Sequence, residues 1–174
     1  TINVDDNTVP TINCPTNLVL ECSSGANYVS QINAWIATAT ASDLCDMSVA
    51  ITTDYNGVNV PPLSCTQSIG LVVIFTATDD CGNISTTLQT IHVQDVTAPV
   101  INSLPAPSTI NCPATPSFAT ATASDNCGST FSLVFNDVTT NGDCAGEYSV
   151  TRTWTATDLC GNVTVATQTI NVDD

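Results

Sequence analysis

The sequence predicts an all-β protein made of two tandem β-sandwich domains, and three features lead to this prediction. Short segments rich in Thr, Val and Ile alternate with Gly, Pro, Asn and Asp, the pattern of short strands joined by tight turns. One stretch occurs twice, as FTATDDCGN at Phe75–Asn83 and as WTATDLCGN at Trp154–Asn162. Nine Cys in 174 residues indicate cross-links, which small domains with limited cores need.

A six-residue segment marks the domain boundaries. It reads TINVDD at Thr1–Asp6, TIHVQD at Thr90–Asp95 and TINVDD again at Thr169–Asp174. A self-match at a spacing of about 80–90 residues is the signature of a domain array. Because the first and last copies are identical, we expect the chain to be one period of a longer array. The predicted boundaries are 1–6 for the end of a preceding repeat, 7–95 for domain 1 and 96–174 for domain 2.

Alternating hydrophobicity places the strands and their buried faces. We predict strands near 17–22, 34–41, 47–54, 70–78 and 84–94, and near 108–112, 117–123, 130–136, 147–157 and 163–172. Leu71, Val73, Phe75 and Ala77 share one parity and should face the core, as should Val150, Trp154 and Ala156. Arg152 has the same parity, so we expect its stem to pack and its head to reach solvent or a carboxylate. A ligand-contacting arginine is the alternative.

The net charge of −15 excludes several classes of partner. Sixteen acidic residues stand against a single cation, Arg152, so nothing can neutralise the phosphates of nucleic acid or bind an anionic membrane surface. No stretch has the roughly 18 apolar residues of a membrane span, so direct membrane insertion is not expected. The carboxylate and amide oxygens favour Ca²⁺ as a bound ion.

An enzyme is not expected either. The only His, His92, lies in a strand-like run, and neither G-x-S-x-G nor H-E-x-x-H occurs. The paired carboxylates of the turns lack the aromatic-lined cleft that a glycosidase would need.

The cysteines occupy equivalent positions in the two domains, and their spacing fits no metal-binding motif. Such a pattern predicts disulfides formed in an extracellular, oxidising compartment. Cys14 is the odd residue, and we expect it to be unpaired, either as a buried thiol or as a cross-link to a partner chain. The aligned pairs are Cys22 with Cys112, Cys45 with Cys127, Cys65 with Cys144, and Cys81 with Cys160.

Four cysteines per domain allow three pairings, and sequence alone does not choose between them. In an immunoglobulin-like sandwich, the loops after the second and sixth strands lie at the same end. The two runs ATASD-x-C and TATD-x-C should end at these loops. We therefore predict the bonds Cys45–Cys81 and Cys127–Cys160, with Cys22–Cys65 and Cys112–Cys144 at the opposite end.

The acidic turns are the candidate metal sites. The ATASD runs end at Asp43 and Asp125, and the TATD runs end at Asp79 and Asp158. If these loops are neighbours, each pair meets the incoming linker and its carboxylates, and three acidic segments could hold Ca²⁺ between domains. The alternative is that Asp and Asn are ordinary turn residues that bond their own backbone. The linker carboxylates are Asp5 and Asp6 for domain 1 and Asp95 for domain 2.

These runs carry a family resemblance. ATASDNCG, TRTWTATDLCGN, QTINVDD and DVTAPVI resemble the HYR-like, Ig-like repeats of giant bacterial surface proteins, including adhesins of gliding bacteria exported by the type IX route. The resemblance covers both domains and implies Ig-like sandwiches in a beads-on-a-string array outside the cell. It also implies a second cysteine near Ile84–Leu88 to pair with Cys14, and that cysteine is missing.

The predicted function is therefore structural. We expect a repeat of an extracellular filament or adhesin stalk, whose partners are neighbouring repeats of the same chain or filament. Disulfides and interdomain Ca²⁺ would stiffen it, and Pro10 and Pro99 would restrict the linkers. The alternative is a binding module for a cell-surface glycan or protein, with Tyr28, Trp35 or Tyr55 as exposed contacts. Burial of Trp35 would favour the stalk.

Overall fold

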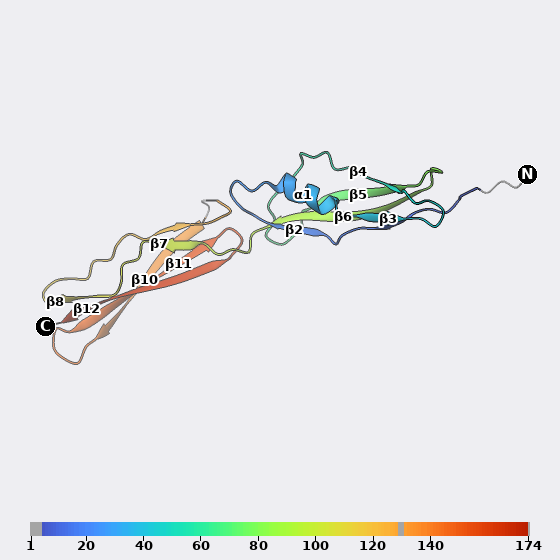
Figure 1. The fold of residues 1–174 in the computed structure, drawn as a ribbon. Coiled ribbons are helices and arrows are strands. Elements are labelled where there is room, and N and C mark those ends of the chain that lie inside the picture. Colours follow the sequence, from blue (N-terminus) through green and yellow to red (C-terminus); the bar gives the residue numbers. More distant parts are fainter. Residues whose placement is uncertain (1–4, 129–130, 174) are drawn as a thin grey trace, which may run out of the picture. The chain divides into compact units, whose positions relative to one another are not determined.

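The computed structural model describes residues 5–128 and 131–173, and the chain divides into two compact units, Thr1–Asp95 and Val96–Asp174 (Figure 1). Apart from one short helix, the described elements are strands, as the composition predicts. Unit 1 contains β1 (Thr11–Asn13), β2 (Leu18–Glu21), α1 (Tyr28–Ile36), β3 (Thr40–Ser42), β4 (Ala50–Thr53), β5 (Leu71–Thr78) and β6 (Ile84–Gln94). Unit 2 contains β7 (Val100–Asn102), β8 (Ser108–Asn111), β9 (Thr122–Ser124), β10 (Phe131–Asn141), β11 (Tyr148–Asp158) and β12 (Val163–Asp173).

Both units have the same sheet topology. In unit 1 a four-stranded sheet has the order β2-β6-β5-β4, and β1 pairs with β3 in a second, smaller sheet. In unit 2 the corresponding orders are β10-β11-β12-β8 and β7-β9. The early strand of each large sheet runs parallel to the last one, β2 beside β6 and β8 beside β12. The other pairs are antiparallel.

The core of unit 1 lies on the predicted face of β5. Val73, Phe75 and Ala77 are fully buried, and Leu71 packs against the edge of this cluster. Their outward neighbours are more exposed, because successive side chains of a strand point to opposite faces. The predicted core face of this strand is therefore confirmed.

The predicted strand at 34–41 is wrong in most of its length, because α1 occupies its first part. Ile32, Trp35, Ile36 and Ala39 recur at helical spacing and pack into or against the core. Asn27 caps the helix, its Oδ1 accepting a hydrogen bond from the backbone N–H of Ser30 at 3.0 Å. Only the last residues of the predicted strand, in β3, are extended.

Trp35 fixes α1 to the sheet. Its ring meets Phe75 edge-on, with centroids 5.4 Å apart and planes at 78°, a favourable aromatic geometry. Its Nε1–H donates to the carbonyl of Thr16 at 2.9 Å. These two contacts anchor α1 to the core of unit 1. No other helix lies in residues 5–128 and 131–173, and α1 is too short to cross a membrane.

Unit 2 repeats this arrangement without a helix in its described residues. Trp154 takes the position of Phe75 in the aligned repeat and is 2% exposed, and Ala156 and Ile170 are also buried. The ring of Phe118 meets Trp154 edge-on, at 6.0 Å and 77°. The same T-shaped contact therefore occurs in both units, but in unit 2 the second ring comes from a loop.

Arg152 pairs with a carboxylate, in agreement with the sequence. Its Nε–H and Nη2–H donate to the two carboxylate oxygens of Asp137, each at 2.7 Å. The two residues face each other across β10 and β11. The pair is half-exposed, so it neutralises both charges without the full cost of burying them.

Candidate functional site

The repeated D-x-C-G-N turns are built around a buried carboxylate. Asp79 is 6% exposed, and its two oxygens accept hydrogen bonds from the backbone N–H and the side-chain Nδ2–H of Asn83, both at 2.8 Å. Asp158 accepts the same two bonds from Asn162, at 2.9 and 2.8 Å. Each Gly has a positive φ, near 90°, which explains why Gly stands at this position. The motif is therefore a self-contained Asx-type turn.

These hydrogen bonds keep both carboxylates ionised. Burial raises the pKa of Asp79, but the side-chain and backbone donors of Asn83, with backbone donors of Cys81 and Gly82, bring that pKa below its ordinary value. The pKa of Asp158 is lowered against the same burial effect by Asn162 and the backbone of its own turn. A buried anion satisfied by N–H donors is a stable structural element.

Asn83 also holds the incoming linker of unit 1. Its Nδ2–H group donates to the backbone carbonyl of Asp6 at 3.1 Å, and Pro10 is fully buried a few residues later. The same side chain therefore joins the β5–β6 turn to the chain that enters the unit. The sequence pattern placed the linker at this pole through its carboxylates, and no spacing signal pointed to the amide of Asn83.

The two acidic turns of unit 1 lie side by side. Asp43 Oδ1 accepts from the backbone N–H of Cys45 at 2.8 Å, and Asp46 Oδ2 accepts from the backbone N–H of Asp80 at 2.8 Å. The second bond links the turn after β3 directly to the turn after β5. In unit 2 the equivalent Asp125 Oδ1 accepts from the N–H of Cys127 at 2.8 Å.

Three ligand atoms gather at this pole of unit 1. One carboxylate oxygen each from Asp6 and Asp43 and the sulfur of Cys45 lie within 4.8 Å of one another. The predicted third carboxylate, Asp79, does not join them, because its oxygens already accept hydrogen bonds from its own turn. Asp5 is exposed and lies outside this group.

The donor set fits Ca²⁺ only in part. Two hard carboxylates suit the ion, whereas a thiol does not, and Ca²⁺ takes six to eight oxygen ligands. In unit 2, Asp125 Oδ2 is buried and has no hydrogen-bond donor in the part of the chain that the structure describes, so it is an acceptor that a cation could satisfy. The predicted set of Asp95, Asp125 and Asp158 draws on both units and stays a prediction.

The cysteines differ from the predicted framework in half of their bonds. Cys22 and Cys65 of unit 1 and Cys127 and Cys160 of unit 2 are disulfide-bonded. Cys45, Cys81, Cys112 and Cys144 are thiols, so the predicted Cys45–Cys81 and Cys112–Cys144 bonds are not formed in the structure. Cys14 is a half-buried thiol, and burial raises its pKa.

The acidic pole of unit 1 changes the electrostatics of one of these thiols. The carboxylate of Asp6, then burial, the carboxylate of Asp43 and the nearby Cys81 raise the pKa of Cys45. A higher pKa means less of the thiolate that disulfide formation requires. Nothing in the structure explains why Cys112 and Cys144 are thiols.

The aromatic residues predicted as exposed contacts are not exposed. Tyr28, Trp35 and Tyr55 are half-buried and pack against the core of unit 1. The hydroxyl of Tyr28 accepts from the backbone N–H of Ser23 at 2.6 Å. These three side chains therefore stabilise unit 1, and they offer no aromatic patch for a ligand.

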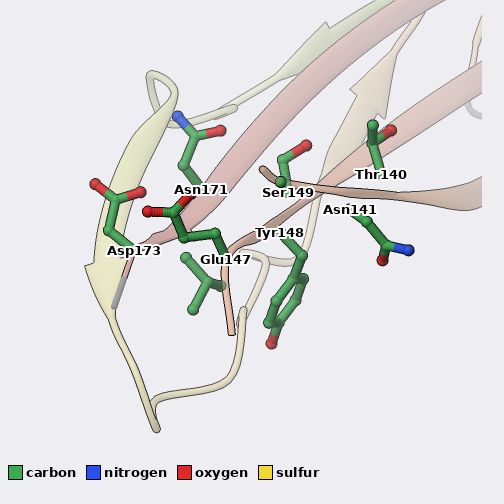
Figure 2. Close-up of a pocket in the computed structure, with 9 residues that line it drawn as sticks. Thr140, Asn141, Glu147, Tyr148, Ser149, Asn171 and Asp173 are labelled. Carbon is green, nitrogen blue, oxygen red and sulfur yellow. The ribbon is translucent and has the colours of Figure 1, made fainter. Parts of the chain in front are cut away.

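A polar cavity of about 200 Å³ lies where the β10–β11 hairpin meets the end of β12. The carboxylates of Glu147 and Asp173 and the amide of Asn171 lie on one side, and Thr140, Asn141 and Tyr148 lie on the other (Figure 2). The residues of this cavity come from three strand ends and form no motif, so the sequence did not predict it.

Residues 100–172 match the family described as "HYR-like domain with 4 cysteines". The match covers most of the second unit, and for that unit it confirms the resemblance drawn from the ATASDNCG and TATDLCGN runs. The described part of the chain is nearly all-β, and Cys22, Cys65, Cys127 and Cys160 are disulfide-bonded in it. A search of curated proteins found no match.

Several cadherin structures are similar to this chain at low identity. Drosophila N-cadherin EC1-4 is 15% identical, with 96% of this chain and 50% of that chain covered and a TM-score of 0.37. The protocadherin gammaB4 extracellular domain is 15% identical, with 98% of this chain and 34% of that chain covered and a TM-score of 0.40. Human mucin-like protocadherin EC1-2 is 10% identical, with 94% of this chain and 98% of that chain covered and a TM-score of 0.32. The chain spans half or less of the first two, and these TM-scores are too low to support a functional comparison.

Proposed function

We propose that this chain is a structural segment of an extracellular bacterial filament or adhesin stalk, built from tandem HYR-like domains with boundaries at 1–6, 7–95 and 96–174. The observation that carries the proposal is the bond from Asn83 to the backbone carbonyl of Asp6. This bond fixes the chain at the point where it enters a repeat, which is what a stiff array of domains needs and a mobile linker lacks. The partners are neighbouring repeats.

Surface charge and cross-links support a role outside the cell. With a net charge of −15, long copies repel one another and stay soluble as separate fibres. The disulfides of the two units require an oxidising compartment to persist. If the chain has this role, it is secreted and attached to the cell surface. A structural segment of this kind needs no catalytic activity.

We further propose that all four predicted disulfides close in the secreted protein. The bonded pair of unit 1, Cys22 and Cys65, aligns with the thiol pair of unit 2, Cys112 and Cys144. The bonded pair of unit 2 aligns in turn with the thiol pair Cys45 and Cys81. Each predicted pair of positions therefore carries disulfide-bonded cysteines in one of the two repeats, which supports closure of the same bond in the other. Titration of thiols in the air-oxidised, denatured protein should give one, from Cys14, whereas five would overturn the proposal.

Calcium would add to this stiffening at the acidic pole. Asp6 and Asp43 would supply oxygens in unit 1, and Asp125, with its unsatisfied Oδ2, would supply one in unit 2. We expect Ca²⁺ to raise the melting temperature and EDTA to reverse the rise, with the D125N variant losing the part that belongs to unit 2. An unchanged melting temperature with Ca²⁺ at several pH values would rule the ion out.

Small-angle X-ray scattering of the whole chain tests the stalk itself. A stiff segment gives a narrow distribution of interatomic distances with a constant maximum dimension, and EDTA should broaden it if Ca²⁺ contributes. A compact particle, or a distribution as broad as that of freely jointed domains, would contradict the proposal.

A further inference from the structure

Unit 2 has an open pocket where unit 1 has a helix. In unit 1, α1 covers Phe75 through Trp35. In unit 2 the aligned Trp154 is met edge-on by the ring of Phe118, which comes from a loop. A cavity of about 250 Å³ remains between the loop at 118–121 and β10, and its lining is Phe118, Ala119, Thr120, Ala121, Leu133, Phe135, Arg152 and Trp154.

The walls of this pocket are fixed before any ligand arrives. The guanidinium of Arg152 lies between two rings, 4.4 Å from the centroid of Phe118 and 3.9 Å from that of Phe135, within the range of cation–π attraction. Its two bonds to Asp137 hold the head group in one orientation. A fixed site loses little side-chain entropy on binding.

The pocket offers an apolar face beside a neutral polar pair. Phe135 is 59% exposed, although it lies opposite the buried Trp154 and points to the same face of the sheet. The Arg152–Asp137 pair stands one step further along the same face of β10 and β11. It presents carboxylate acceptors and the three guanidinium N–H groups that the ion pair does not use.

Charge selects a neutral ligand. An anion would meet a chain of net charge −15 whose only cation is already neutralised by Asp137. A cation would have to approach the guanidinium itself. The volume lies just below the roughly 300–1,000 Å³ of pockets for drug-sized ligands, so it suits a single ring. A pyranose has an apolar C–H face for Phe135 and adjacent hydroxyls that can both donate to Asp137 and accept from Arg152.

We propose that the Phe118–Phe135–Arg152–Trp154 pocket of unit 2 binds one neutral pyranose ring of a surface glycan. This site is independent of the stalk function, because none of its lining residues belongs to the D-x-C-G-N turn. The sequence placed glycan binding on aromatic residues of unit 1, which are half-buried. The proposed site lies instead in unit 2, at a position that α1 covers in unit 1 and that no described helix covers in unit 2.

Two-dimensional ¹H–¹⁵N NMR of the whole chain tests the site with little ambiguity. Arg152 is the only arginine and Trp154 is one of two tryptophans, so each gives an assignable side-chain signal. The probes are the methyl glycosides of glucose, mannose, galactose and N-acetylglucosamine, each up to about 20 mM, since one ring binds with a Kd on the order of millimolar. We expect the Arg152 Nε–H and Trp154 Nε1–H signals to shift while the Trp35 signal stays in place.

A matched pair of variants separates the pocket from the rest of β10. F135A should weaken binding at least about tenfold. V134A, equally exposed but on the opposite face of the strand, should leave binding unchanged. The proposal is overturned if no glycoside moves the two signals, if F135A binds as well as the parent, if glucuronate binds more tightly than glucose, or if only N-acetyl-phenylalaninamide binds.

Discussion

Removal of the disulfide-bonded cysteines of unit 2 should weaken that unit strongly. Cys127 and Cys160 enclose a loop of about 33 residues, and the loop-entropy relation gives about 4 kcal/mol for such a cross-link. The double variant C127A/C160A should lose this amount of unfolding free energy. For a unit of this size, each kcal/mol lowers the melting temperature by about 4–8 °C, so a fall of about 15–30 °C is expected.

The buried Trp154 provides the assay for this variant. In a W35F background its fluorescence reports on unit 2 alone, because the chain has two tryptophans and Trp154 is almost fully buried there. Urea unfolding then gives the free energy directly. With dithiothreitol present, the variant and its parent should unfold at the same urea concentration. A difference below about 1 kcal/mol without reductant would refute the cross-link reasoning.

Three further predictions concern single side chains. N83A should cost about 1–2 kcal/mol, because it removes the amide that joins the turn to the linker, and amide exchange near Asp6 should become faster; unchanged exchange would contradict the linker role. W35A should destabilise unit 1 by about 2–4 kcal/mol in urea and leave unit 2 unaffected, whereas a loss in both units would show that they are coupled. The hydrogen bonds and charge of Arg152 lower the pKa of Asp137 in the folded protein. Their contribution to the stability of the folded state is therefore fully present above the unfolded pKa of about 3.9, and it is lost as the pH falls through the lower folded pKa. D137N should therefore flatten the decline of the melting temperature below about pH 4, and an equally steep decline in the variant would assign the acid effect to other carboxylates.

Repetition made most strands predictable. The parity of Val73, Phe75 and Ala77 was sufficient to assign the core face of β5, because a sheet with one buried face enforces alternation. The same parity placed Arg152 on the inward face, where its head group pairs with Asp137. Both results depend only on the period of a strand.

The helix was missed although its signal was present. Ile32, Trp35, Ile36 and Ala39 have helical spacing, but the segment is short, and its Ile and Trp residues also favour strands. The aligned region of unit 2 has no helix in its described part, so repetition misled the assignment here. Tertiary packing against Phe75 decided the outcome.

The candidate site was predictable in position and less so in its contacts. Spacing brought the Asp43 and Asp79 turns to one pole, where the structure joins the two turns through Asp46 and Asp80. Which carboxylates remain available depends on local N–H donors, and Asn83 takes up both oxygens of Asp79. A side-chain amide that serves both its own turn and a linker leaves no trace in residue spacing.

The parallel pairing of each unit's early strand with its last one has a mechanical consequence. In unit 1 the chain enters beside Asn83, whereas the ends of β2 and β6 meet at the opposite pole, where the N–H of Cys22 donates to the carbonyl of Gln94 at 2.6 Å. Tension along the chain would therefore pull β2 and β6 in opposite directions along their shared edge. Their hydrogen bonds would be loaded together in shear instead of opening one after another. Each repeat would act as a mechanical clamp, and the cross-link at Cys22 would limit how far a failed clamp could extend.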